Sequence, residues 1–156
     1  MMRFGIIAKD FADPEALASA YLSKYFANQK IEYPINPFRM LKDEGVLFSL
    51  MDFKKREGVY VPAENSEDIP VVGINVNRPI TRQRFTAAHE LCHHFRDADN
   101  QISCPMYGKK NAIEKYADSF AAALLMPMQE LRHQVNKKKN SRGNVSFDDV
   151  LEIADF

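Results

Sequence analysis

The stretch TAAHELCHHFRD, residues 86–97, decides how this sequence is interpreted. From Phe85 to Phe95 most side chains are small or apolar, which is typical of a buried helix. Three of the chain's four histidines nevertheless stand in this stretch, together with one glutamate. A polar group that is buried without a partner costs about 1–3 kcal/mol. The stretch therefore needs a partner that its apolar neighbours do not supply. The polar residues in the middle of the stretch are His89, Glu90, His93 and His94.

His89, Glu90 and His93 form the pattern H-E-x-x-H. On a helix, residues four positions apart lie on one face with their β-carbons about 5–6 Å apart. Two imidazoles at this spacing can each direct a nitrogen at one zinc ion. Glu90 lies at the edge of the same face, where it can reach a water molecule activated by the ion and act as the catalytic base. The alternative is a pair of core histidines beside a solvated glutamate, and the apolar surroundings disfavour it.

A third metal ligand is expected from EKYAD, residues 114–118, because catalytic zinc has three protein ligands. Glu114, Ala117 and Asp118 share one face of the predicted helix. We expect Glu114 to bind the metal, and Ala117 to let the two helices approach closely. Asp118 can accept the remaining ring N–H of a ligand histidine and so orient it. The alternative is a surface glutamate with a neighbour four residues on, and the preceding H-E-x-x-H favours the metal site.

The flanking sequence predicts an α+β fold, because helices and strands are segregated along the chain. Strands are expected over 45–53, 59–64 and 70–77, between two groups of helices. The strand within 71–77 is either a sheet edge beside the cleft or an ordinary half-buried strand. Helices are predicted over 13–29, 34–45, 81–97, 112–126 and 127–135, and after Ser146.

Composition narrows the class of protein further. The chain has 156 residues, enough for one ordinary domain. The chain has 21 basic residues (Lys and Arg) and 21 acidic residues (Asp and Glu), so its net charge is about zero. Direct nucleic-acid binding is therefore not expected, because it favours an excess of basic residues. There is no secretory leader pattern and no apolar run long enough for a membrane helix. With only two cysteines, Cys92 and Cys104, a reduced cytoplasmic protein is expected.

Two segments give the sequence a family resemblance. RQRFTAAHELCHH at 82–94, followed by E-x-x-A-D-x-F-A-x-x-L-L-M-P at 114–127, resembles the ImmA/IrrE-type metallopeptidases. The resemblance implies a zincin-like domain of the gluzincin kind, with a small, mostly antiparallel sheet packed on the helix that carries H-E-x-x-H. It also implies zinc (Zn2+) held by His89, His93 and Glu114, with Glu90 as catalytic base. One departure is Cys92, where the family usually has glycine.

The same resemblance implies a substrate, since the family's known targets are helix-turn-helix repressors. We therefore expect a zinc endopeptidase that cleaves such a repressor. The alternative is an anti-repressor that keeps the zinc site but sequesters its partner without cleaving it. The group that steadies the oxyanion is left open among His94, Tyr107 and Tyr116. The expected organisation is a zincin-like metallopeptidase domain over 1–135, a linker over 136–145 and the start of a C-terminal helical segment over 146–156.

Overall fold

The structure is a computed structural model that describes residues 8–27, 29–98 and 111–155. Within these ranges six helices and three strands follow one another in an α+β arrangement, as expected from the sequence. The elements are α2 (Pro14–Phe26), α3 (Pro37–Asp43), β1 (Leu47–Met51), β2 (Gly58–Val61), β3 (Val71–Asn75), α4 (Ile80–Arg96), α5 (Ala112–Leu125), α6 (Met128–Lys138) and α7 (Phe147–Asp155).

Several helices begin where the sequence supplies a capping side chain. Asp13 accepts hydrogen bonds from the backbone N–H groups of the first turn of α2. Asn111 caps α5 by accepting a hydrogen bond from the backbone nitrogen of Glu114 at 2.9 Å. This cap fixes the helical turn that carries the predicted third metal ligand.

The three strands form a mixed sheet in the order β1-β3-β2. Strand β3 pairs in parallel with β1 and antiparallel with β2. The sheet is therefore not mostly antiparallel, and the strand within 71–77 is central instead of an edge. The physical reason lies in β3 itself, since consecutive residues from Val72 to Asn75 are buried, so both faces of the strand are covered, as is typical of a central strand.

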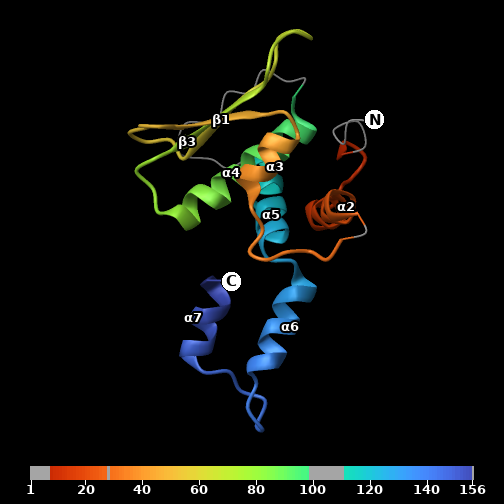
Figure 1. The fold of residues 1–156 in the computed structure, drawn as a ribbon, viewed down its shortest axis with the longest axis vertical. Coiled ribbons are helices and arrows are strands. Elements are labelled where there is room, and N and C mark those ends of the chain that lie inside the picture. Colours follow the sequence, from red (N-terminus) through yellow and green to blue (C-terminus); the bar gives the residue numbers. More distant parts are fainter. Residues whose placement is uncertain (1–7, 28, 99–110, 156) are drawn as a thin grey trace.

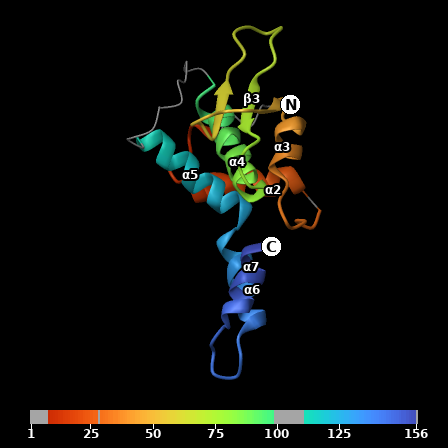
Figure 2. The same ribbon diagram turned by 90° about the vertical axis from the view of Figure 1, so that its left-hand side faces the viewer.

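The elements form layers, with α4 packed against the sheet and α5 packed against α4 (Figures 1 and 2). Helix α2 packs on α5, and α3 packs on α4 and β1. Phe95 on α4 links three helices, because its ring lies 4.7 Å from that of Tyr21 and 6.3 Å from that of Phe120. Ala117 is only 1% exposed, as expected for a small residue at the contact between helices. The core thus fixes α4 and α5 against each other.

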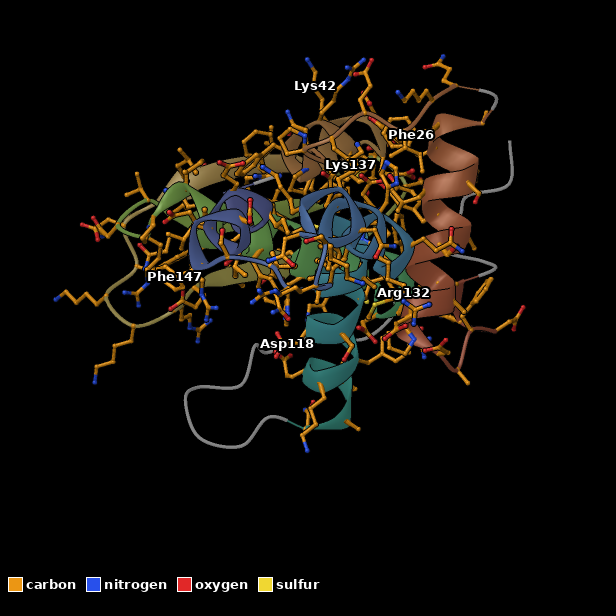
Figure 3. The ribbon with its side chains drawn as sticks, turned by 90° about the horizontal axis from the view of Figure 1, so that it is seen from below. Phe26, Lys42, Asp118, Arg132, Lys137 and Phe147 are labelled. Atoms are coloured by element: carbon orange, nitrogen blue, oxygen red, sulfur yellow. The ribbon has the colours of Figure 1, made fainter. Side chains whose placement is uncertain are left out.

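Helices α6 and α7 form a hairpin that extends away from the sheet and from the helices packed on it (Figures 1 and 2). Seen from below, α7 lies on the side of α6 away from α2, and Phe147 belongs to this outer helix (Figure 3). Lys138 joins the two helices through ion pairs with Asp149, at 3.7 Å, and Glu152. Residues 136–138 of the predicted linker are helical and end α6. In the described part of the chain, no helix has the length and apolar character needed to cross a membrane.

Candidate metal centre

The H-E-x-x-H residues lie in the C-terminal half of α4, on the side that faces α5. The rings of His89 and His93 have their centroids 4.8 Å apart, as expected for residues one turn apart on a helix. His93 is fully buried, and the side chain of His89 is 13% exposed. Glu114 approaches both rings from the first turn of α5. The structure therefore brings together the three residues predicted as metal ligands.

The donor atoms of these three residues converge on one point. The Nε2 atoms of His89 and His93 are 3.0 Å apart. Glu114 places Oε2 3.3 Å from His89 Nε2 and Oε1 3.5 Å from His93 Nε2. One ligand atom from each residue lies within 4.8 Å of the others. Tetrahedral bonds of about 2.0–2.1 Å would separate the ligand atoms by about 3.3 Å. The spacing of the donors thus fits a metal ion.

The orientation of the two rings supports the same conclusion. His89 Nδ1 lies 3.0 Å from Asp118 Oδ1, and His93 Nδ1 lies 2.8 Å from Asp97 Oδ2. An ionised carboxylate can only accept a hydrogen bond, so each Nδ1 carries the proton and donates it. Both Nε2 atoms are then available as metal donors, and two such lone pairs 3.0 Å apart favour a cation between them.

Asp118, labelled in Figure 3, lies where the sequence analysis expected it, beside the candidate ligand His89. Asp97 was missed, although it performs the same task for His93. A signal for it was present, because Asp97 follows His93 by four residues and so lies one turn along the same helix face. It stands at the C-cap of α4 and is the last residue of the helix predicted over 81–97.

Glu90 is buried beside the two histidines, with 2% of its surface exposed. Burial raises the pKa of this carboxyl to about 7, while the charges of His89 and His93 oppose the shift and that of Glu114 adds to it. No hydrogen-bond donor among the described residues reaches Glu90 Oε2. Glu90 is therefore a carboxyl of raised pKa next to the converging metal donors.

The pKa values of His89 and Glu114 shift in opposite directions. Burial lowers the pKa of His89, but a hydrogen bond to Glu114 and nearby carboxylate charges outweigh it, so the net shift is upward. The hydrogen bond to His89 lowers the pKa of Glu114. A metal cation bound here would replace the proton in the hydrogen bond between these two groups.

The three candidates for oxyanion stabilisation have different surroundings. His94 turns away from the metal ligands, and its Nδ1 lies 3.1 Å from the hydroxyl of buried Tyr60. Tyr116 donates its hydroxyl to the carbonyl of Phe11 at 2.9 Å, and the Arg96 guanidinium lies 3.9 Å from its ring centroid. Tyr116 therefore has a structural role. Tyr107 lies outside the described residues.

Cys92, which stands where the family usually has glycine, is packed in the core. Cys92 is fully buried, and burial raises the pKa of its thiol well above the usual range. It behaves as a small apolar residue here. Cys104 lies outside the described residues.

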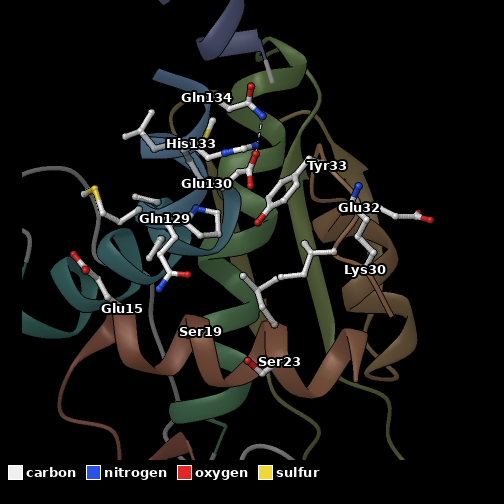
Figure 4. A pocket seen from close by; sticks show the side chains of 18 of the residues that line it. Glu15, Ser19, Ser23, Lys30, Glu32, Tyr33, Gln129, Glu130, His133 and Gln134 are labelled. Carbon is white, nitrogen blue, oxygen red and sulfur yellow. Dashed lines mark hydrogen bonds between the residues drawn. The ribbon is translucent and has the colours of Figure 1, made fainter. Parts of the chain in front are cut away.

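A groove of about 1370 Å³ lies on another part of the molecule, between α2, α6 and the segment around Tyr33 (Figure 4). Its apolar floor includes Leu22 and Met126, and its rim carries side chains of both charges, such as Lys30 and Glu130. Glu130 accepts a hydrogen bond from Gln134 in this rim. None of the candidate metal ligands lines the groove.

Comparison with known proteins identifies the class to which this fold and site belong. The chain belongs to the family described as the IrrE N-terminal-like domain, which matches residues 41–154. It is similar to the radiation response metalloprotease IrrE of Deinococcus deserti, with 30% identity over 92 residues. That match covers 55% of this chain and 31% of the relative, so the chain spans about a third of the curated relative's length. The resemblance to ImmA/IrrE-type metallopeptidases is confirmed.

Proposed function

We propose that this protein is a zinc-dependent endopeptidase that cleaves a protein regulator, a helix-turn-helix repressor, in the cytoplasm. The observation that carries the proposal is the convergence of His89, His93 and Glu114 within 4.8 Å of one another, with Glu90 buried beside them. Membership of a metallopeptidase family supports the same reaction class.

Zinc is the metal that this donor set favours. Two imidazole nitrogens and one carboxylate are a common ligand set of catalytic zinc, which keeps a further coordination position open. The carboxylates of Asp97 and Asp118 fix the ring orientations, an arrangement that recurs around zinc-bound histidines. Both aspartates are thus assigned to orienting the ligands.

Zinc bound here would act as a Lewis acid that polarises a peptide carbonyl and activates water. Glu90 accepts the proton of the attacking water and then delivers a proton to the nitrogen of the leaving amine. In the metal-free protein the pKa of Glu90 is about 7. A group that transfers protons works best when its pKa lies near the working pH, so Glu90 suits this task at neutral pH. Exclusion of bulk water around Glu90, which is 2% exposed, strengthens its electrostatic interactions.

The ligand assignment is tested with Glu114→Ala. This variant should lose most of its zinc while the fold survives, because Glu114 is partly exposed on the first turn of α5 and is not part of the core. Zinc content is measured after gel filtration, and circular dichroism reports the fold. Glu32→Ala, which removes an exposed carboxylate, is the matched control. Full zinc content in Glu114→Ala would show that the third ligand is another group.

The choice of a repressor as substrate rests on the family resemblance. The curated relative is named a radiation response metalloprotease, which supports a regulated proteolytic event. A folded repressor would be cut in an exposed linker or after local opening of a helix. We therefore expect cleavage at one or two sites, with unrelated folded proteins left intact.

The decisive experiment incubates the zinc-loaded protein with a repressor encoded next to it, with and without a chelator, and follows the repressor by intact mass. Wild type should cleave it, whereas Glu90→Gln should bind zinc normally and cleave at least ~100-fold more slowly. If the repressor stays whole while its DNA binding is relieved, the protein acts by sequestration. If neither occurs, this substrate assignment is wrong.

A further inference from the structure

Gly58, the first residue of β2, lies where the sheet comes closest to the candidate catalytic helix. It is buried and pairs with Ile74 on β3. A β-carbon at this position would lie 2.4 Å from Thr86 Cγ2 and 2.8 Å from Glu90 Oε1. Carbon atoms pack at about 3.5–4.0 Å, so even a methyl group does not fit. Gly58 therefore leaves the space that the Glu90 side chain occupies.

The crowding at Gly58 is steric and does not arise from its backbone conformation. Positive φ angles among the described glycines occur at Gly45 and Gly143, so the backbone of Gly58 is accessible to alanine. The two closest contacts are with side-chain atoms of α4, Thr86 Cγ2 and Glu90 Oε1. A side chain at this position would displace the carboxylate of Glu90, the methyl group of Thr86, or both.

We infer that Gly58 is a positioning residue, whose missing side chain allows the Glu90 carboxylate to take its place beside His89 and His93. This inference rests on the proposed function, in which Glu90 transfers protons. A carboxylate that is buried on all sides has few alternative positions, because the surrounding core is close-packed. Displacing it by a fraction of an ångström changes its distance to the reacting water without removing it.

A double variant separates positioning from packing. Thr86→Ser removes Cγ2, the closest atom to the added methyl group, and leaves the contacts with Glu90 Oε1 and, at 3.1 Å, with the backbone oxygen of Gly73. Gly58→Ala alone should lower both the unfolding temperature and the rate of repressor cleavage. Gly58→Ala/Thr86→Ser should regain most of the unfolding temperature and keep near-normal zinc affinity and KM. Its kcat should remain about 10- to 100-fold below that of Thr86→Ser, the usual scale for a misplaced reacting group.

Gly73→Ala is the matched control in the same sheet. A β-carbon at Gly73 would meet side chains on the other face of the sheet, namely Met51 Sδ and Phe53 Cζ at 2.9 Å and Val59 Cγ1 at 3.0 Å. This variant should lose stability at most, with kcat unchanged. If the double variant regains both stability and kcat, Gly58 serves packing alone and the inference is wrong.

A second readout does not depend on cleavage. Crystal structures of zinc-loaded Gly58→Ala/Thr86→Ser and Thr86→Ser should show Glu90 Oε1 shifted away from residue 58, while His89 and His93 stay in place. An unmoved carboxylate would overturn the inference. If wild type binds zinc but cleaves no repressor, the proposed function fails, and the position of Glu90 still decides the role of Gly58.

Discussion

Burial of Glu90 costs the folded chain free energy, because its carboxylate is removed from water and its Oε2 atom has no hydrogen-bond donor among the described residues. A bound cation would offset this cost through its charge. The metal-free protein bears the cost in full. The residue proposed for catalysis should therefore be a source of instability whenever the metal is absent.

Replacing Glu90 with glutamine should stabilise the metal-free protein at alkaline pH. The pKa of Glu90 rises from 4.5 to about 7 on folding, so the folded chain holds this proton more tightly than the unfolded chain. Wild type therefore loses stability as the pH rises from about 4.5 to about 7, by up to ~3 kcal/mol at 1.36 kcal/mol per pKa unit. Glutamine does not titrate, so the stability advantage of Glu90→Gln should widen from pH 5 to pH 8.

Urea unfolding of both proteins in the presence of a chelator measures this difference. Repeating the titration with saturating zinc is the control, because the cation should shrink the advantage of Glu90→Gln. Parallel stability curves for the two metal-free proteins between pH 5 and pH 8 would contradict the assigned pKa shift.

Asp97 and Asp118 should both tune the affinity for the metal. Each accepts a hydrogen bond from the Nδ1–H group of a candidate ligand histidine, at 2.8 Å for Asp97 and 3.0 Å for Asp118. Loss of such a partner usually costs 10–100-fold in metal affinity or activity. Asp97→Ala and Asp118→Ala should weaken zinc binding on this scale, and the asparagine variants less, because the amide oxygen still accepts the hydrogen bond. Competition with a coloured chelator gives the affinities, with exposed Asp10→Asn as control.

At the scale of elements, the site depends on the crossing of α4 and α5. Helical periodicity was enough to predict that His89 and His93 share one helix face and that Glu114 and Asp118 share another, because each pair lies on one helix at a fixed spacing. Helical periodicity could not predict which elements contact one another. Gly58 lies just before the strand predicted over 59–64, and its approach to Glu90 depends on how the sheet packs on α4. Local periodicity therefore predicts which residues share a face, but not what covers them.

The cap of α5 should affect the metal site more than the cap of α2 does. Asn111→Ala and Asp13→Ala each remove an N-cap, which costs ~1 kcal/mol of stability. Asn111 holds the backbone nitrogen of Glu114, so its loss should also loosen a metal ligand and weaken zinc binding. Asp13→Ala should leave zinc affinity unchanged. Thermal unfolding and zinc competition distinguish the two, and equal zinc affinities would show that α5 holds Glu114 without its cap.

At the scale of the whole molecule, the α+β class followed from the order of helical and strand patterns. The mixed sheet did not follow, because strand order depends on contacts between distant residues. The near-continuous apolar run from Val71 to Ile74 was the available sign of a central strand. The sequence also placed a linker at residues 136–145, whereas α6 continues to Lys138.

The hairpin of α6 and α7 should be dispensable for metal binding. The hydrophobic core cluster of the described residues includes no residue after Leu125, and α7 packs on α6. On α7, Phe147, Val150 and Leu151 are exposed, and Ile153 is its one buried apolar side chain among the described residues. Elements joined by few buried contacts open independently of the core. Removing residues 128–156, which contain both helices of the hairpin, should therefore reduce the helical signal while zinc affinity and the main unfolding transition stay the same.

Phe120→Ala is the contrasting variant for this truncation. Phe120 is fully buried on α5, and loss of such a ring costs ~3–5 kcal/mol. It should lower the main unfolding transition of both the full chain and the truncated chain by the same amount, because the cavity lies in the shared core. Circular dichroism melting and zinc competition on the four proteins test this. A truncated chain that binds zinc weakly or melts early would show that the hairpin stabilises the metal site, and that the core does not end at α5.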